Sequence, residues 1–193
     1  MVFNIRAHHM ADDNFKVVCS KQDIILRKNT EKQNAYLISF QAHATDEKIE
    51  QLQKKHLYQL IGDLCPDIIL KNKVTALDDG GHSVMFLFAR IGKELGLSQK
   101  CLYLNTYVET NTKNKLVVRG IGPPASDINS EYDIVNAKYI DMCVNIDENK
   151  LVTLHFSFHL DLNEDLPSYM QDLPGLLMLK ILMGLKKYIE GTV

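Results

Sequence analysis

The sequence predicts an α+β fold in which a curved antiparallel β-sheet wraps around a long C-terminal α-helix. The first observation is that residues 149–162 alternate strictly between apolar and polar side chains, as in a strand with one buried face. The second is that residues 175–190 carry apolar side chains at helical spacing up to Gly191, a residue that ends helices. The third is that strand-like segments separated by turn residues fill most of the remaining chain.

Residues 149–162 form the last predicted strand, and its two faces differ in polarity. One face is apolar, with Val152, Leu154, Phe156, Phe158, Leu160 and Leu162. The other face is polar, with Thr153, His155, Ser157, His159 and Asp161. Because successive side chains on a strand point to opposite sides of a sheet, we expect the apolar face to lie against the helix and the polar face to lie in water.

The predicted C-terminal helix is apolar around most of its circumference. A surface helix needs an apolar stripe only about 100° wide. This helix has a much wider set, which consists of Leu176, Leu177, Met178, Leu179, Ile181, Leu182, Met183 and Leu185. Such a helix is either central to the fold or in contact with an apolar ligand, and flexible methionine side chains suit a wall that adapts to a ligand.

Three strands and one amphipathic helix are predicted before residue 73. Short polar segments join the strands into an antiparallel meander that covers residues 15–19, 23–27 and 35–42. Apolar side chains then recur at helical spacing from Ile49 to Leu64, with Thr45 as the N-cap and Pro66 at the end. Residues 67–70 are predicted to add a short helical turn.

From residue 73 onward the sequence predicts hairpins. Turns at 78–81, 111–114 and 147–149 join strands over residues 74–77, 83–89, 101–109, 115–120, 138–146 and 149–162. The longer connection 90–98 contains glycine and has Leu95 and Leu97 at its tip. Exposed apolar side chains on a loop call for a functional explanation.

Length and charge limit the number of domains and the kinds of partner to expect. With 193 residues, the chain is expected to form one domain over residues 15–193, preceded by an N-terminal arm over residues 1–14. The net charge is −2 and the Lys and Arg residues form no dense cluster, so nucleic acid is not expected as a partner. We expect the protein to be a monomer.

Cysteine usage and hydropathy indicate a compartment. The four cysteines, Cys19, Cys65, Cys101 and Cys143, form no C-x-x-C motif, and free thiols in or beside apolar strands are typical of a reducing environment. No apolar run reaches the roughly 18 residues of a membrane span, and residues 1–14 lack the apolar core of a signal peptide. A cytoplasmic location is therefore expected.

No catalytic residue, metal site or cofactor is expected. His155, Ser157 and His159 share a strand face, but no Asp, Glu or Cys at ligand spacing accompanies them, so a solvated face is favoured over a metal site. Cys101 and Cys143 have no identifiable base nearby and are interpreted as structural thiols.

Thr106 is the polar strand residue with the best indication of an inward position, because it shares parity with Leu102 and Leu104. One or two polar side chains are expected to turn inward from the set Tyr103, Asn105, Thr106, Tyr107, Arg119 and Asp141. A buried polar group without a partner costs about 1–3 kcal/mol, so it should meet another polar group, a water molecule or a ligand.

Several short segments, together with the order of elements, match one known family. They are Phe15-Lys16-Val17-Val18, Asp23-Ile24-Ile25-Leu26, residues 97–103, Leu151-Val152-Thr153, Asp161-Leu162 and Leu166-Pro167. Over residues 15–190 the chain resembles the steroidogenic-acute-regulatory-protein-related lipid transfer (START) domain of the helix-grip superfamily. It departs from the family at residues 99–101, where Gln-Lys-Cys replaces a frequent Pro-Arg-Asp, and it has no tryptophan.

The resemblance implies a helix-grip fold with a cavity between the concave face of the sheet and the C-terminal helix. The cavity would hold one lipid, sterol-like or other apolar molecule. The expected ligand-binding residues are Phe86, Phe88, Leu102, Leu104, Thr106, Ile140, Met142, Leu154, Phe156, Phe158, Leu177, Met178 and Ile181. The loop 90–98 would be the gate, with Leu95 and Leu97 making transient contact with a membrane surface when it opens.

The expected function is non-enzymatic binding of a lipid, with transfer between membranes as an extension. Two alternatives stay open at this point. One is an enzyme on the same scaffold, such as a cyclase or hydrolase, which would need titratable groups that converge inside the cavity. The other is a protein-interaction module that uses the sheet or the exposed leucines.

Overall fold

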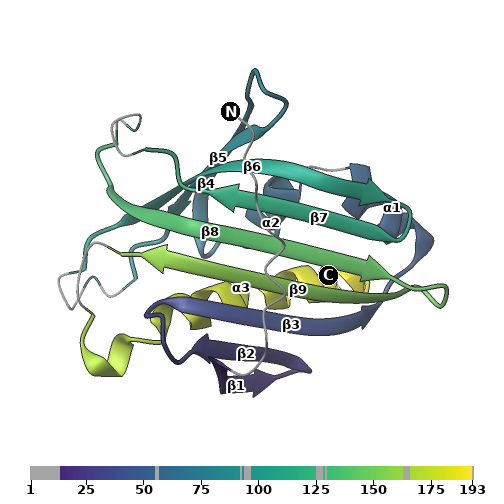
Figure 1. Cartoon of the computed structure of the whole chain (residues 1–193), viewed down its shortest axis with the longest axis horizontal. Helices are drawn as coiled ribbons and strands as arrows, with labels where there is room; N and C mark the ends of the chain where they lie inside the picture. The colour runs from purple at the N-terminus through teal and green to yellow at the C-terminus, as the bar shows by residue number, and fades with distance from the viewer. Residues whose placement is uncertain are drawn as a thin grey trace.

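The computed structural model describes residues 14–54, 57–91, 93, 97–124, 128, 130–162 and 166–192, with the backbone alone at residues 53 and 54. The N-terminal arm predicted at residues 1–14 lies outside this range except for Asn14. Figure 1 shows a broad curved sheet with the helices gathered on one of its sides.

One sheet of nine strands dominates the fold, in the order β1-β2-β3-β9-β8-β7-β6-β5-β4. Its strands are β1 (Phe15–Lys21), β2 (Ile24–Asn29), β3 (Ala35–His43), β4 (Ile69–Ala76), β5 (His82–Phe88), β6 (Lys100–Thr112), β7 (Lys115–Ile121), β8 (Asp133–Ile146) and β9 (Leu151–Asp161). Pairing is antiparallel except for a short parallel contact of β6 with β8. This order places β9 inside the sheet, between β3 of the N-terminal meander and β8 of the later hairpins (Figure 1).

The helices are α1 (Asp46–Lys54), α2 (Leu57–Leu64) and α3 (Leu173–Ile189), with a 3₁₀ turn, η4, at Ser168–Met170. The predicted N-cap is confirmed, because the Lys48 N–H donates to the Thr45 hydroxyl oxygen at 3.3 Å. The helix predicted from Ile49 to Leu64 is confirmed over its described residues, which belong to α1 and α2, and residues 55 and 56 between them lie outside the described residues. After Pro66 the chain makes one turn and β4 begins at Ile69, where pairing with Phe88 replaces the predicted helical turn.

Two strands begin earlier in the chain than the sequence predicts. β4 begins at Ile69 and β8 begins at Asp133. The extra part of β8 lies beside the start of β6, with Lys100 opposite Asp133 in the parallel pairing. Periodicity along one strand carries no information about a partner that joins it from elsewhere, so this extension was missed.

The alternation predicted for the last strand is confirmed on β9 at Val152, Leu154, Phe156 and Phe158, which are all buried. On the other face His155 is exposed. Ser157 differs from the prediction, since only 7% of it is exposed. Its short side chain lies between the larger residues Leu37 on β3 and Asp141 on β8, which are its register partners.

α3 packs on the concave side of the sheet, and Figure 1 shows it behind β9 and β3. Two glycines bring it close to its neighbours. A Cβ atom on Gly175 would lie 2.7 Å from the Tyr36 ring, and one on Gly184 would lie 3.1 Å from the Cys65 sulfur. Not all of its apolar surface is covered, because Leu176 is 42% exposed.

Candidate functional site

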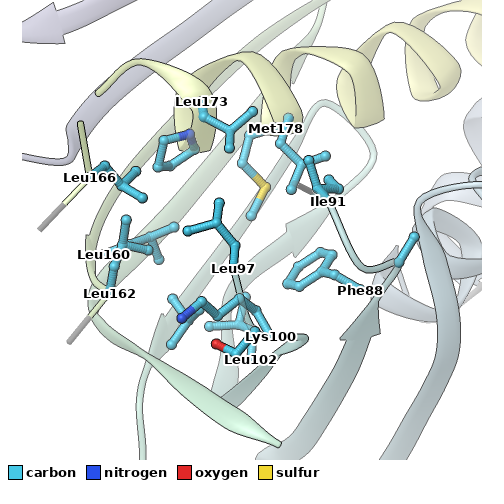
Figure 2. A pocket seen from close by; sticks show the side chains of 15 residues that line it. Phe88, Ile91, Leu97, Lys100, Leu102, Leu160, Leu162, Leu166, Leu173 and Met178 are labelled. Carbon is cyan, nitrogen blue, oxygen red and sulfur yellow. The ribbon is translucent and has the colours of Figure 1, made fainter. Parts of the chain in front are cut away.

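A pocket lies between the first turns of α3 and the end of the sheet where β5 and β9 finish and β6 and β8 begin (Figure 2). Its position follows from the topology, because the short β6–β8 pairing brings these strand ends together. The residues that line it are Phe88, Ala89, Ile91, Leu97, Ser98, Lys100, Leu102, Val135, Leu160, Leu162, Leu166, Leu173, Pro174, Leu177 and Met178.

The wall of the pocket is apolar except at one edge, called its mouth below, where two half-buried polar side chains lie. Ser98 and Lys100 are its polar members. The Lys100 Nζ lies 3.4 Å from the Asp133 carboxylate, and the Ser98 hydroxyl donates a hydrogen bond to the same carboxylate. That hydrogen bond and the Lys100 charge hold the pKa of Asp133 below its usual range, so Asp133 is an anion at neutral pH.

Hydrogen bonds fix the segment on one side of the mouth. The Arg90 Nε donates to the Leu97 carbonyl at 3.2 Å, and the Gln99 side-chain amide donates to the Phe88 carbonyl at 2.9 Å. These bonds tie the two ends of the predicted gate to each other. Leu97 therefore points from a held backbone into the pocket, as Figure 2 shows.

The pocket has a volume of about 80 Å³. An apolar cavity of about 150 Å³ admits a benzene molecule, and ligand sites for drug-sized molecules occupy about 300–1,000 Å³. In this closed form the pocket is therefore too small for a lipid. A larger ligand requires side chains such as Leu97, Leu177 and Met178 to move.

The structure divides the predicted ligand-binding residues into two groups. Phe88, Leu102, Leu177 and Met178 line the pocket together with the predicted gate residue Leu97, whereas Leu95 lies outside the described residues. The others are buried in the core and do not line the pocket, namely Phe86, Leu104, Thr106, Ile140, Met142, Leu154, Phe156, Phe158 and Ile181. Their contact with a ligand stays a prediction.

Thr106 is buried, in agreement with its predicted inward position. Its hydroxyl donates to the His82 carbonyl at 3.1 Å, so a neighbouring strand already satisfies it. Arg119, another member of the candidate set, forms ion pairs with Glu109 at 2.9 Å and with Asp141 at 3.7 Å.

Sequence analysis missed several lining residues, although part of the signal was present. Leu160 and Leu162 belong to the apolar face predicted for the last strand, and Leu166 belongs to a segment that carries the family resemblance. Ile91 and Ser98 belong to the predicted gate loop 90–98, whereas nothing in the sequence pattern placed the remaining residues at a pocket: Ala89, Lys100, Val135, Leu173 and Pro174. These come together only through tertiary packing.

Reactive groups do not gather in the described part of the pocket. Lys100 is the one titratable side chain among its described lining residues. Cys101 is buried behind the wall, and this burial raises the pKa of its thiol. Over the described residues, no three His, Cys, Asp or Glu side chains come together as a metal site.

Comparison with solved structures shows that the chain has a START-like, helix-grip fold. The lipid transfer and protein localization domain of human StarD13 superposes with a TM-score of 0.71 at 9% identity, over 91% of this chain and 88% of that one. Human StAR-related lipid transfer protein 5 superposes with a TM-score of 0.71 at 13% identity, over 93% of this chain and 88% of that one. A STAR-related lipid transfer protein from Xanthomonas axonopodis superposes with a TM-score of 0.68 at 11% identity, over 92% of this chain and 99% of that one.

Sequence comparison adds nothing to this result, because no family model and no curated protein matches the chain. The resemblance to the START domain that the sequence indicates is thus confirmed at the level of the fold. Among the helices that the structure describes, none is both long and apolar enough to cross a bilayer.

Proposed function

We propose that this protein binds a lipid or another apolar small molecule between α3 and the sheet, and that it passes this ligand between membranes. The observation that carries the proposal is the apolar pocket at the first turns of α3. The START-like fold gives independent support, since similar structures are named for lipid transfer.

Binding requires the pocket to open, and removal of an apolar chain from water provides a driving force for that. An acyl chain of about 15 methylenes gains about 0.8 kcal/mol for each methylene that leaves water. Separating the Leu97 segment from α3 would extend the pocket toward the core residues Phe156, Phe158 and Ile181. Displacing the packing of these residues costs part of this gain. The open form can therefore be occupied when its free energy exceeds that of the closed form by less than the gain.

The proposal is of binding without catalysis. Lys100 by itself provides no acid–base or nucleophile–base pair, and this supports a binding role for the described part of the pocket. We also propose a reducing, cytoplasmic location, which is supported by four free cysteines, two of them buried.

The test is lipid uptake by a variant in which the pocket is filled. Leu177→Trp places a larger side chain at a half-buried position of the pocket wall, so we expect it to weaken uptake about ten-fold or more. Leu176→Trp is the matched control, because Leu176 is the adjacent residue of α3, is 42% exposed and does not line the pocket. Protein recovered from vesicles of phosphatidylcholine, cholesterol and oleic acid is analysed by native mass spectrometry.

The two variants also report on their own structures, because the unmodified chain has no tryptophan. We expect the tryptophan fluorescence of the Leu177→Trp variant to be blue-shifted by the pocket and that of the Leu176→Trp variant to resemble tryptophan in water. If the unmodified protein takes up none of these lipids, or if both variants bind them as it does, the proposed function is wrong.

A further inference from the structure

We propose that the ligand is a single-chain amphiphile with an anionic head, that it enters tail first, and that its head stays at the pocket mouth beside Lys100. This inference rests on the proposed lipid-binding function and adds two things to it. It names the class of head group and it fixes the direction in which the ligand lies.

Among the described residues, the core next to the pocket offers no charged partner for a head group. In the part of the chain that the structure describes, three polar or charged residues are buried besides tyrosines and cysteines: Thr106, Ser157 and Lys186. Thr106 already donates to a carbonyl, and Ser157 lies on the opposite face of β9 from Phe156 and Phe158. An ionised head placed among the core side chains would therefore lose its water without gaining a counter-charge.

Lys186 is the buried cation, and it lies away from the pocket. Its ammonium donates to the Gln22 carbonyl at 2.9 Å and pairs with Glu190 at 3.2 Å. It is eight residues beyond Met178 on α3, which corresponds to about 12 Å along the helix axis. A head group that enters at the pocket meets Lys100 long before it could reach Lys186.

Buried tyrosines provide the rival position for a head group. The Tyr36 hydroxyl donates to the Gln171 carbonyl at 2.8 Å, while Tyr58 is buried in the core and does not line the pocket, with its ring 6.1 Å from that of Phe86. Burial, and then the charge of Asp141, raises the pKa of Tyr58, so its hydroxyl stays protonated and could offer an anion a hydrogen bond but no positive charge. Tyr58 therefore marks the deep orientation, and its replacement distinguishes that orientation from ours.

The mouth of the pocket, in contrast, combines positive charge with partial burial. The Lys100 side chain is 19% exposed, and Figure 2 shows it next to Leu102, across the pocket from Met178. Its ion pair with Asp133, at 3.4 Å, is longer than the roughly 2.7–2.9 Å of a strong charged hydrogen bond. Asp133 is 59% exposed, so water weakens its hold on the ammonium.

A ligand carboxylate suits this position better than an uncharged head does. It can approach the Lys100 ammonium from the pocket side while its chain lies against Leu97 and Leu102. Arg90, which donates to the Leu97 carbonyl, adds a second positive charge beside the same segment. A charged pair in a partly dry site is stronger than a neutral hydrogen bond, so the anion is preferred.

The experiment compares three probes that share one chain: oleic acid, oleyl alcohol and methyl oleate. Their dissociation constants are measured at pH 8 for the unmodified protein and for Lys100→Met, Asp133→Asn and Tyr58→Phe. We expect Lys100→Met to weaken oleate binding about ten-fold and to change alcohol binding by less than about two-fold. Asp133→Asn should strengthen oleate binding, because it removes a carboxylate that competes for Lys100, and Tyr58→Phe should leave it unchanged.

The opposite signs expected for Lys100→Met and Asp133→Asn separate this inference from a merely structural role of the ion pair. If Lys100→Met fails to fold, the sign found for Asp133→Asn decides. Unchanged oleate binding in Lys100→Met, or equal weakening in Tyr58→Phe, overturns the inference and leaves the proposed function intact. If none of the three probes binds, the inference is also overturned, and the proposed function fails only when phosphatidylcholine and cholesterol are refused as well.

Discussion

Replacing Phe158 by alanine is expected to lower the free energy of unfolding by about 3–5 kcal/mol. Phe158 has no exposed surface, its ring stacks on Tyr36 with centroids 5.3 Å apart, and its centroid lies 5.2 Å from that of Phe156. The mutation leaves a cavity where β3, β9 and α3 meet, and a rigid sheet cannot collapse to fill it. Urea denaturation followed by circular dichroism measures the loss.

The matched control is His155→Ala on the same strand. His155 is exposed on the other face of β9, so its removal should change the free energy of unfolding by less than about 0.5 kcal/mol. A similar loss in both variants would mean that the two faces of β9 do not differ as the structure shows.

Gly175→Ala is expected to destabilise the protein by about 1–3 kcal/mol, although alanine is the better helix former by about 1 kcal/mol. The added Cβ would lie 2.7 Å from two ring carbons of Tyr36. That ring cannot easily retreat, because Phe158 stacks on it and its hydroxyl donates to the Gln171 carbonyl. The first turns of α3 must then shift, which thermal and urea unfolding will detect as lower stability.

Gly184→Ala on the same helix provides the comparison for this mutation. Its Cβ would lie 3.1 Å from the Cys65 sulfur, a milder contact. Because the gain in helix propensity offsets this contact, we expect a change of about 1 kcal/mol or less. Equal stability of the two variants would contradict the tight fit of Gly175 against Tyr36.

The order of elements and the faces of β9 could be predicted because they depend on local patterns. Strict alternation places Phe156 and Phe158 on one face whatever the neighbouring strand is. The inward position of Thr106 followed from the same parity rule, and Thr45 was identified as an N-cap from its residue type and its place before the helix.

The end of the sheet at which the pocket lies could not be predicted from sequence, because it depends on which strand ends meet. Val135 and Leu102 become neighbours through the parallel contact of β6 with β8, which no local pattern indicates. The volume was equally hidden, since an apolar face predicts burial without saying whether a side chain or a ligand covers it. Phe86 and Met142 are buried by the protein itself in the closed form.

The pairing of β3 with β9 affects how the chain folds during its synthesis. His43 on β3 lies opposite Leu151 on β9, roughly a hundred residues later in the chain. At about 5–20 residues per second, synthesis leaves the β3 edge without its partner for at least several seconds. Until β9 is made, the nascent chain carries an unpaired strand edge, which is a kind of surface prone to aggregation.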